Sequence, residues 1–204
     1  MGIKLVATCL TLEQAEVCDS MGIENIRTYA RSYGEIRPGC VTDFSVHCFN
    51  SDALDVLKTL GVSRATLHPE LNLAQMRDIK KSIHTEAVVY GRLPLMVMKH
   101  PPTLTSKSKT SSASGVNIGG KSLGTAEITD RTNTRFFFHG DCLYNSVPVF
   151  MADKLAEVQK AGIICGRLMF TAETANETRE IIMAYLNRKA ITIQFTRGKF
   201  YSRV

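Results

Sequence analysis

Short apolar runs alternate with helical patterns along most of this chain. Residues 4–8 form an apolar run, and Thr11 followed by Gln14 forms a capping box, the pattern that opens a helix. The same reading predicts further strands at residues 25–30, 43–49, 64–68, 86–90 and 163–170, and helices at residues 12–21, 51–60, 73–80, 153–161 and 175–186. Such alternation predicts an α/β fold with a parallel sheet.

One junction recurs three times along the chain. Each copy joins the end of a helix, through a glycine and an aliphatic pair, to a strand: MGIENIRTY at 21–29, LGVSRATL at 60–67 and AGIICGRLMF at 161–170. Repeated junctions of this kind are typical of a parallel α/β sheet or barrel, so we expect about five or six β/α units.

Residues 101–150 interrupt this alternation. Residues 101–126 are rich in Ser, Thr, Gly and Lys without periodicity, which predicts a flexible basic loop. Residues 127–150 contain a turn at 130–134 between two β-prone runs, which predicts a β-hairpin insertion. We therefore expect one α/β domain over residues 1–204 that carries this loop and hairpin.

Composition narrows the class of protein. The chain has 204 residues, is 44% hydrophobic and 22% charged, and has six cysteines and a net charge of +6. These values exclude a disordered chain and a disulfide scaffold, and free cysteines indicate a reducing compartment. The N-terminus lacks a signal-peptide pattern, and no apolar run is long enough to span a bilayer, so we expect a cytoplasmic protein with no membrane partner. The excess charge permits RNA or an anionic substrate.

Four blocks carry a family likeness. They are FSVHCFNSDALDVLKTLGVSRATLHPELNLAQMRDI at 44–79, EAVVYGRLPLM at 86–96, ITDR at 128–131, and the stretch from GDCLYNSVPVF to GRLMF at 140–170. In this order they resemble the collagenase-like peptidase family, peptidase family U32. The resemblance implies a partial or rearranged TIM-like (β/α) barrel of which this chain is the later part. It also implies a peptidase that acts on a protein or peptide. Another chain or an oligomer would supply the missing barrel segment.

The family offers other chemistries too. Some members carry an iron–sulfur cluster and hydroxylate RNA bases or quinone precursors, and in them a cysteine follows the GR-x-PL block. Pro101 stands roughly at that place here, which argues against a cluster in this chain, while a divalent metal stays open. Three readings therefore remain: a peptidase, an RNA- or quinone-modifying protein, and an inactive barrel fragment that acts as a subunit.

Polar residues near the expected strand ends are the candidate site, because barrel enzymes work at the C-terminal ends of their strands. Glu86 and Glu70 are candidate paired carboxylates for acid–base catalysis, and His47, like His68, is a candidate base or metal ligand. The structural alternatives are a helix-dipole role for Glu70 and a core role for His47. Candidate substrate-binding residues are Arg92, Tyr90, Asn50, Lys99, His100 and Arg167. The chain has no standard peptidase motif, so the catalytic type stays undefined.

Overall fold

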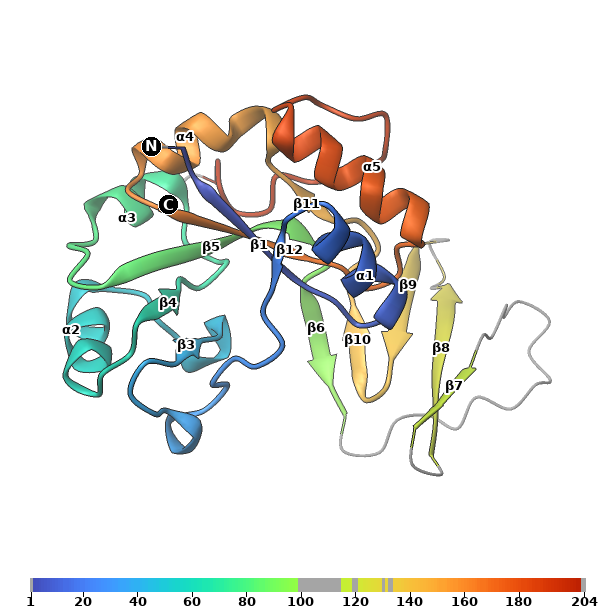
Figure 1. Cartoon of the computed structure of the whole chain (residues 1–204), viewed down its shortest axis with the longest axis horizontal. Helices are drawn as coiled ribbons and strands as arrows, with labels where there is room; N and C mark the ends of the chain where they lie inside the picture. The colour runs from blue at the N-terminus through green and yellow to red at the C-terminus, as the bar shows by residue number, and fades with distance from the viewer. Residues whose placement is uncertain (1, 99–114, 119–120, 130, 132–133, 203–204) are drawn as a thin grey trace. The chain divides into compact units, whose positions relative to one another are not determined.

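The computed structural model describes residues 2–98, 115–118, 121–129, 131 and 134–202 (Figure 1). The chain divides into two compact units, where we expected one domain. The first unit comprises residues 1–91 and 149–204, and the second comprises residues 92–148.

A curled parallel sheet forms a half-barrel in the first unit, which confirms the predicted partial TIM-like barrel (Figure 1). Its parallel strands, in spatial order, are β2 (Glu24–Asn25), β1 (Lys4–Thr8), β12 (Cys165–Met169), β5 (His84–Gly91), β4 (Arg64–Thr66) and β3 (Val41–Thr42). A further strand, β11 (Val149–Phe150), pairs with β5 in the antiparallel sense.

The segment after β2 links the two edges of this sheet. The Ile26 amide donates to the Ala7 carbonyl on β1 at 2.9 Å, while the Ala30 amide donates to the Val41 carbonyl on β3, also at 2.9 Å. The predicted strand at 25–30 is therefore divided between two partners. Because unpaired strand edges attract other chains, the pairing of Ala30 with Val41 gives the β3 edge of the half-barrel a local backbone partner.

Five helices cover the sheet: α1 (Leu12–Ser20), α2 (Ser51–Thr59), α3 (Leu73–Asp78), α4 (Leu155–Lys160) and α5 (Ala175–Leu186). The Thr11 hydroxyl accepts from the Gln14 amide and the Gln14 side chain accepts from the Thr11 amide, so the predicted capping box is confirmed. Gly22, Gly61 and Gly162, which follow three of these helices, have φ of 70°, 77° and 83°. Glycine reaches this left-handed region without steric cost, which explains its recurrence at the repeated junction.

Short 3₁₀ turns interrupt the first unit at η1 (Tyr33–Glu35), η2 (Phe44–Val46) and η3 (Ala152–Lys154). The predicted strand at 43–49 is wrong, because η2 occupies its first half. The alternation of side chains there reflects a tight turn rather than an extended ladder.

An aromatic core joins α5 to the sheet. Tyr90, Phe150 and Tyr185 are each at most 1% exposed, and their ring centroids lie 5.3 to 6.4 Å apart. The Tyr185 hydroxyl donates to the Val89 carbonyl at 2.6 Å and accepts from the Met151 amide at 2.9 Å. Each buried ring contributes roughly 1.5–3 kcal/mol by burial, and these hydrogen bonds fix how α5 lies on β5.

The second unit is an antiparallel sheet of five strands. In spatial order they are β6 (Pro94–Val97), β10 (Cys142–Tyr144), β9 (Arg135–His139), β8 (Lys121–Thr129) and β7 (Gly115–Ile118). Thr129 pairs with Arg135, which places the predicted hairpin turn between β8 and β9. Residues 115–118 and 121–126, expected as loop, are strands that pair with each other. Their backbone groups pair even though the polar sequence has no apolar alternation. The remainder of the predicted loop, 101–114, lies outside the described residues.

Candidate functional site

Two groups of residues lie in the strands of the curled sheet and in the segments that follow them. We call the first the inner cluster: Tyr29, Asp43, Arg64, Glu86 and Arg167. We call the second the mouth cluster: Phe44, His47, Phe49, His68 and Glu70. Both belong to the first unit, and Phe44 lies next to both clusters, with its ring centroid 5.8 Å from the Arg167 guanidinium carbon and 6.3 Å from the His68 ring.

Glu86 is the centre of one half of the inner cluster. Its side chain is fully buried, and Oε1 accepts hydrogen bonds from the Tyr29 hydroxyl at 3.0 Å and the Thr66 hydroxyl at 2.9 Å. Arg64 Nε lies 3.0 Å from Oε2 as an ion pair that lacks the alignment of a hydrogen bond. The carboxylate is therefore surrounded by partners from β4 and from the segment after β2.

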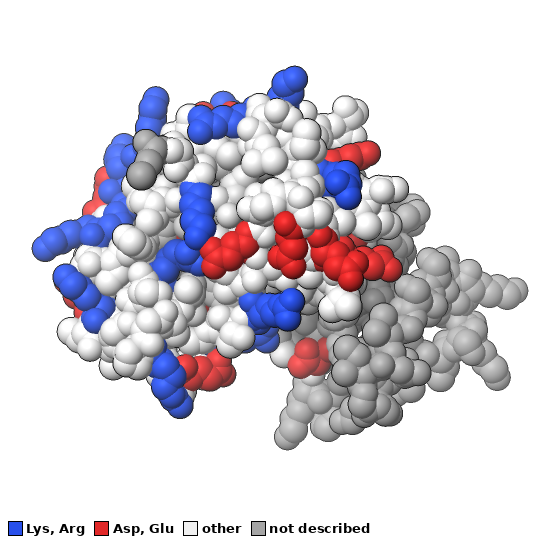
Figure 2. All heavy atoms as spheres, in the orientation of Figure 1, with Lys and Arg blue, Asp and Glu red and all other residues white. Residues whose placement is uncertain are grey.

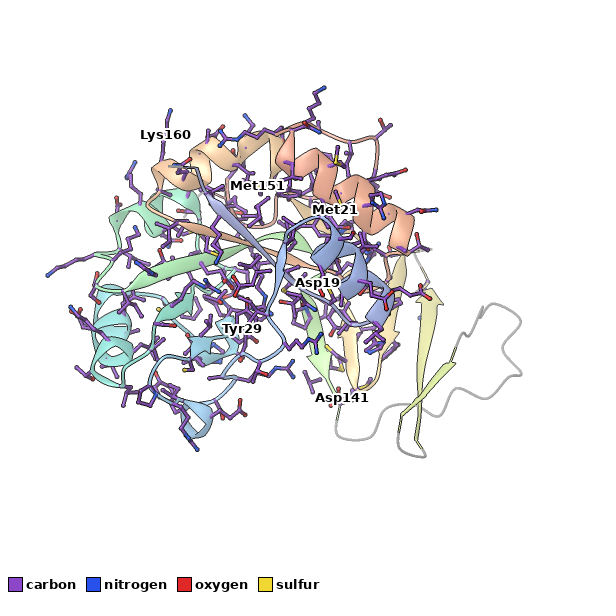
Figure 3. All side chains as sticks on the ribbon, viewed as in Figure 1. Asp19, Met21, Tyr29, Asp141, Met151 and Lys160 are labelled. Carbon is purple, nitrogen blue, oxygen red and sulfur yellow. The ribbon has the colours of Figure 1, made fainter. Side chains whose placement is uncertain are left out.

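Arg167 is the centre of the other half. Its Nη1 lies 2.5 Å from Asp43 Oδ1, and its Nε donates to the Thr8 hydroxyl at 2.9 Å. The guanidinium also lies over the Tyr29 ring, 3.9 Å from the ring centroid. Tyr29, labelled in Figure 3, connects the two halves, because its hydroxyl donates to Glu86 and its ring lies under the Arg167 guanidinium.

The inner cluster is suited to holding strands together. Arg167, Asp43 and Glu86 are at most 8% exposed as residues, and their charges are paired within the protein. A buried charge that loses its partner is strongly destabilising, so such groups are constrained to their present geometry. This placement favours a positioning role for Glu86 and Arg167 over direct contact with a substrate.

Backbone pairing between two strand ends builds the mouth cluster. Cys48 and Leu67 form a parallel β-bridge, and the His68 amide donates to the Cys48 carbonyl at 3.1 Å. This bridge brings the His47 and His68 rings to 5.4 Å between centroids, and the Phe49 and His68 rings to 4.2 Å. Glu70 Oε2 lies 4.0 Å from His68 Nδ1.

His47 has an unusual backbone. Its φ of 59° and ψ of 51° lie in the left-handed region, and its side chain is exposed. A non-glycine residue there costs of the order of 1–2 kcal/mol, which indicates that something other than stability keeps histidine at this position.

Partial burial lowers the pKa of His68 below its ordinary value of 6.5, against a weaker opposing effect of Glu70. His68 is therefore mainly neutral near pH 7, the form in which an imidazole nitrogen accepts a proton. The Glu70 amide lies 3.4 Å from Nδ1 in a long contact, which assigns Nδ1 as the acceptor.

The structure separates the other predicted site residues. Glu70 is exposed in the mouth cluster while Glu86 is buried in the inner cluster, so the predicted carboxylate pair is divided between two environments. Tyr90, the next-to-last residue of β5, is 1% exposed and donates to Glu173 Oε1 at 2.9 Å within the aromatic core. Asn50 caps α2 by accepting from the Ala53 amide at 2.9 Å.

Three predicted binding residues lie beyond the first unit. Arg92 is half-buried at the start of the second unit. Lys99 and His100 lie outside the described residues.

Sequence reasoning missed Tyr29, Asp43 and Glu173. Glu173 Oε2 accepts from the Thr171 amide at 2.6 Å, so this carboxylate fixes the turn after β12. Asp43 was hidden by the strand expected at 43–49, and its position directly after the β-branched pair Val41 and Thr42 was the one available signal.

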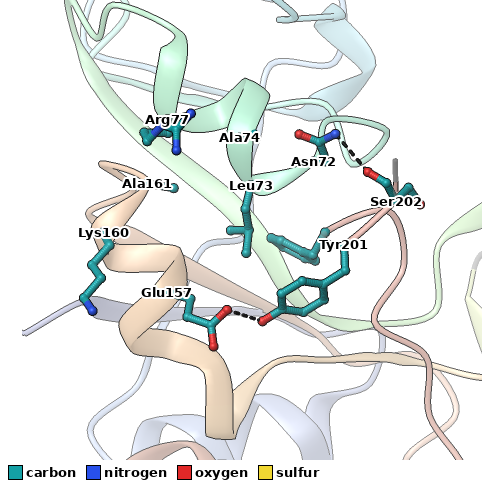
Figure 4. Close-up of a pocket in the computed structure, with 10 residues that line it drawn as sticks. Asn72, Leu73, Ala74, Arg77, Glu157, Lys160, Ala161, Tyr201 and Ser202 are labelled. Atoms are coloured by element: carbon teal, nitrogen blue, oxygen red, sulfur yellow. Dashed lines mark hydrogen bonds between the residues drawn. The ribbon is translucent and has the colours of Figure 1, made fainter. Parts of the chain in front are cut away.

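A hollow also lies between α3, α4 and the C-terminal segment (Figure 4). Its volume is about 420 Å³, and Leu73, Ala161 and Phe200 contribute to its lining. The Tyr201 hydroxyl donates to Glu157 Oε2 across it at 2.5 Å, and the Asn72 amide donates to the Ser202 carbonyl at 3.0 Å. Helices rather than strand ends form this hollow, so it is separate from the mouth cluster.

Charge is unevenly distributed on the face in Figure 2. Acidic side chains gather over α1, whose sequence contains Glu13, Glu16 and Asp19, and basic side chains are dispersed. Among the described residues, no group of three or more His, Cys, Asp or Glu is placed to hold a metal ion. Within the same part of the chain, no helix has the length and apolarity needed to cross a membrane.

Comparison with known proteins finds one family. The model of peptidase family U32 matches residues 39–115, which include the mouth cluster and Glu86. No curated protein and no solved structure matches the chain.

Proposed function

We propose that this chain, whose residues 39–115 match the model of peptidase family U32, hydrolyses peptide bonds at the mouth cluster. The observation that carries the proposal is the pair of imidazoles 5.4 Å apart, His47 and His68, on the segments that follow β3 and β4. Barrel enzymes work at this end of their strands, and His47 is held there in a costly backbone conformation.

Peptide hydrolysis needs a base and an acid at one place. A base removes a proton from water as the oxygen attacks the carbonyl carbon, and an acid then protonates the leaving nitrogen as the C–N bond breaks. His68, with its lowered pKa, suits the base, and the exposed His47 beside it suits the acid. Phe49 offers an apolar surface for a substrate side chain next to both rings.

Denatured collagen and casein are the substrates for the test, each with and without added zinc or a chelator. We expect His68→Ala and His47→Ala to lower the rate of cleavage by about 10²–10⁴-fold, the usual contribution of a general acid or base. His84→Ala is the matched control, because His84 is an exposed histidine at the opposite, N-terminal end of β5. Equal cleavage by all three variants would reject the mouth cluster as the catalytic site.

RNA binding is the second candidate function, and one observation favours it. Residues 99–121 contain four lysines, one histidine and no acidic residue. Binding through phosphates predicts an affinity for single-stranded RNA that falls steeply as salt rises. An affinity independent of salt would exclude this candidate and leave the peptidase proposal untouched.

A further inference from the structure

Two thiols lie together after the end of β1. Cys9 Sγ is 3.6 Å from Cys18 Sγ, within hydrogen-bond distance for sulfur. Cys9 is half-exposed in the connection between β1 and α1, whereas Cys18 is fully buried on α1. Cys9 and Cys18 are nine residues apart in the sequence, so this contact is a feature that only the fold reveals.

The local structure holds the pair together. The Leu10 and Thr11 amides donate to Gln14 Oε1 at 3.1 and 3.2 Å, which ties the connection that carries Cys9 to the first turn of α1. A disulfide needs a sulfur separation of about 2.05 Å, so the two atoms must approach by about 1.5 Å. Rotation of the half-exposed Cys9 side chain is the simplest source of this movement.

We propose that Cys9 and Cys18 are a redox-active pair that a hydroperoxide oxidises to a disulfide. Cys9 is the sulfur that a peroxide can reach. As Cys9 attacks the terminal peroxide oxygen, the O–O bond breaks, an alcohol leaves, and Cys9 becomes a sulfenic acid. The Cys18 sulfur then attacks the Cys9 sulfur, the S–O bond breaks, and water leaves. The two thiols lose two electrons and two protons, and the hydroperoxide is reduced to alcohol and water.

The contact between the sulfurs supports the second step. A Cys9 sulfenic acid forms next to the Cys18 sulfur, because the two sulfur atoms already lie 3.6 Å apart. Cys18 is therefore placed to attack it. Within the described part of the chain Cys40 has no sulfur neighbour of this kind, and because it is also half-exposed it serves as a comparison.

Oxidation would act on the C-terminal side of the half-barrel. The Gln14 side-chain amide donates to the Thr171 and Glu173 carbonyls at 3.2 and 2.7 Å. A disulfide between Cys9 and Cys18 would close a loop of chain that contains Gln14. It would therefore restrain the contact between α1 and the turn after β12. The reduced pair leaves that contact free to adjust.

The test uses the full chain treated with tert-butyl hydroperoxide, then alkylated with iodoacetamide in urea and digested with trypsin. Cys9 and Cys18 fall in one tryptic peptide, residues 5–27, because no Lys or Arg lies between Lys4 and Arg27. We expect this peptide to lose both alkylation sites and to become two hydrogen masses lighter, and dithiothreitol to restore both sites. The peptide that contains Cys40 should stay alkylated.

Two cysteine variants test the roles of the individual thiols. Cys18→Ser should leave Cys9 as a sulfenic acid that dimedone captures, and Cys40→Ser should behave as the wild type. The proposal is overturned if both thiols of peptide 5–27 stay alkylated after oxidation, or if Cys40 enters disulfides as readily as Cys9. The second result would show that oxidation occurs in unfolded chains.

Discussion

Glu86 and Glu70 are two carboxylates of the same β/α segment with opposite surroundings. The Glu86 side chain is fully buried and accepts from Tyr29 and Thr66 beside Arg64, whereas the Glu70 side chain is 71% exposed near His68. The inner cluster commits its charges to the fold, and the mouth cluster leaves its groups reachable. A buried acid whose oxygens already have partners, such as Glu86, is therefore a weaker catalytic candidate than an exposed histidine such as His47.

The largest expected effect separates the two carboxylates directly. Replacing Glu86 with Ala leaves Arg64 without its ion-pair partner and the Tyr29 hydroxyl without its acceptor, so the free energy of unfolding should fall by about 3–5 kcal/mol. Glu70→Ala, the matched control, should change it by less than about 0.5 kcal/mol. Urea unfolding followed by circular dichroism measures both, and similar losses for the two variants would contradict the distinction.

A smaller effect tests Arg167. Arg167→Lys keeps the charge but loses the planar group that bonds Thr8 and Asp43 and lies over Tyr29. We expect a loss of about 1–3 kcal/mol in the free energy of unfolding. Arg77→Lys is the control, because Arg77 pairs with Asp78 on the exposed surface, and it should have no measurable effect. If Arg167→Lys also left the free energy of unfolding unchanged, the inner cluster would need only the positive charge at this position.

His47→Gly tests the mouth cluster, where we expect opposite changes in stability and activity. Glycine relieves the left-handed backbone, so this variant should gain about 0.5–1 kcal/mol in stability while losing peptidase activity. Arg188→Gly is the control at the other non-glycine residue with positive φ among the described residues, and it should gain stability with activity intact. Thermal unfolding and casein cleavage together measure the outcome, and a less stable His47→Gly would remove the argument from strain.

The smallest expected effect is the pH dependence of the mouth cluster. Burial lowers the His68 pKa in the folded state, so the unfolded chain binds more protons below about pH 6.5. His68 therefore contributes stability above that pH, and this contribution is lost as pH falls through its folded pKa. His68→Gln should lose less stability than the wild type between about pH 7 and pH 5, measured by urea unfolding. Parallel pH profiles would contradict the assignment.

Local signals predicted most of the first unit. The capping box at Thr11 and the helix-ending glycines depend on neighbours within a few residues, and they were confirmed. The strand predicted at 43–49 was wrong because an alternation of apolar and polar side chains does not distinguish an extended strand from the turn formed by η2 and His47. The loop predicted at 101–126 was wrong at residues 115–118 and 121–126, which form strands. Their pairing depends on backbone hydrogen bonds, which the side-chain pattern did not indicate.

The α/β pattern, the helix ends, the family likeness and the residue types available for chemistry can all be inferred from the amino-acid sequence. Which of those residues meet depends on the folded chain. Folding buried Glu86 with Tyr29 and Arg64, brought His47 to His68 through the Cys48–Leu67 bridge, and placed Cys9 beside Cys18. The physical reason is that capping and periodicity act within a turn of chain, whereas burial and charge pairing depend on segments brought together by the curl of the sheet.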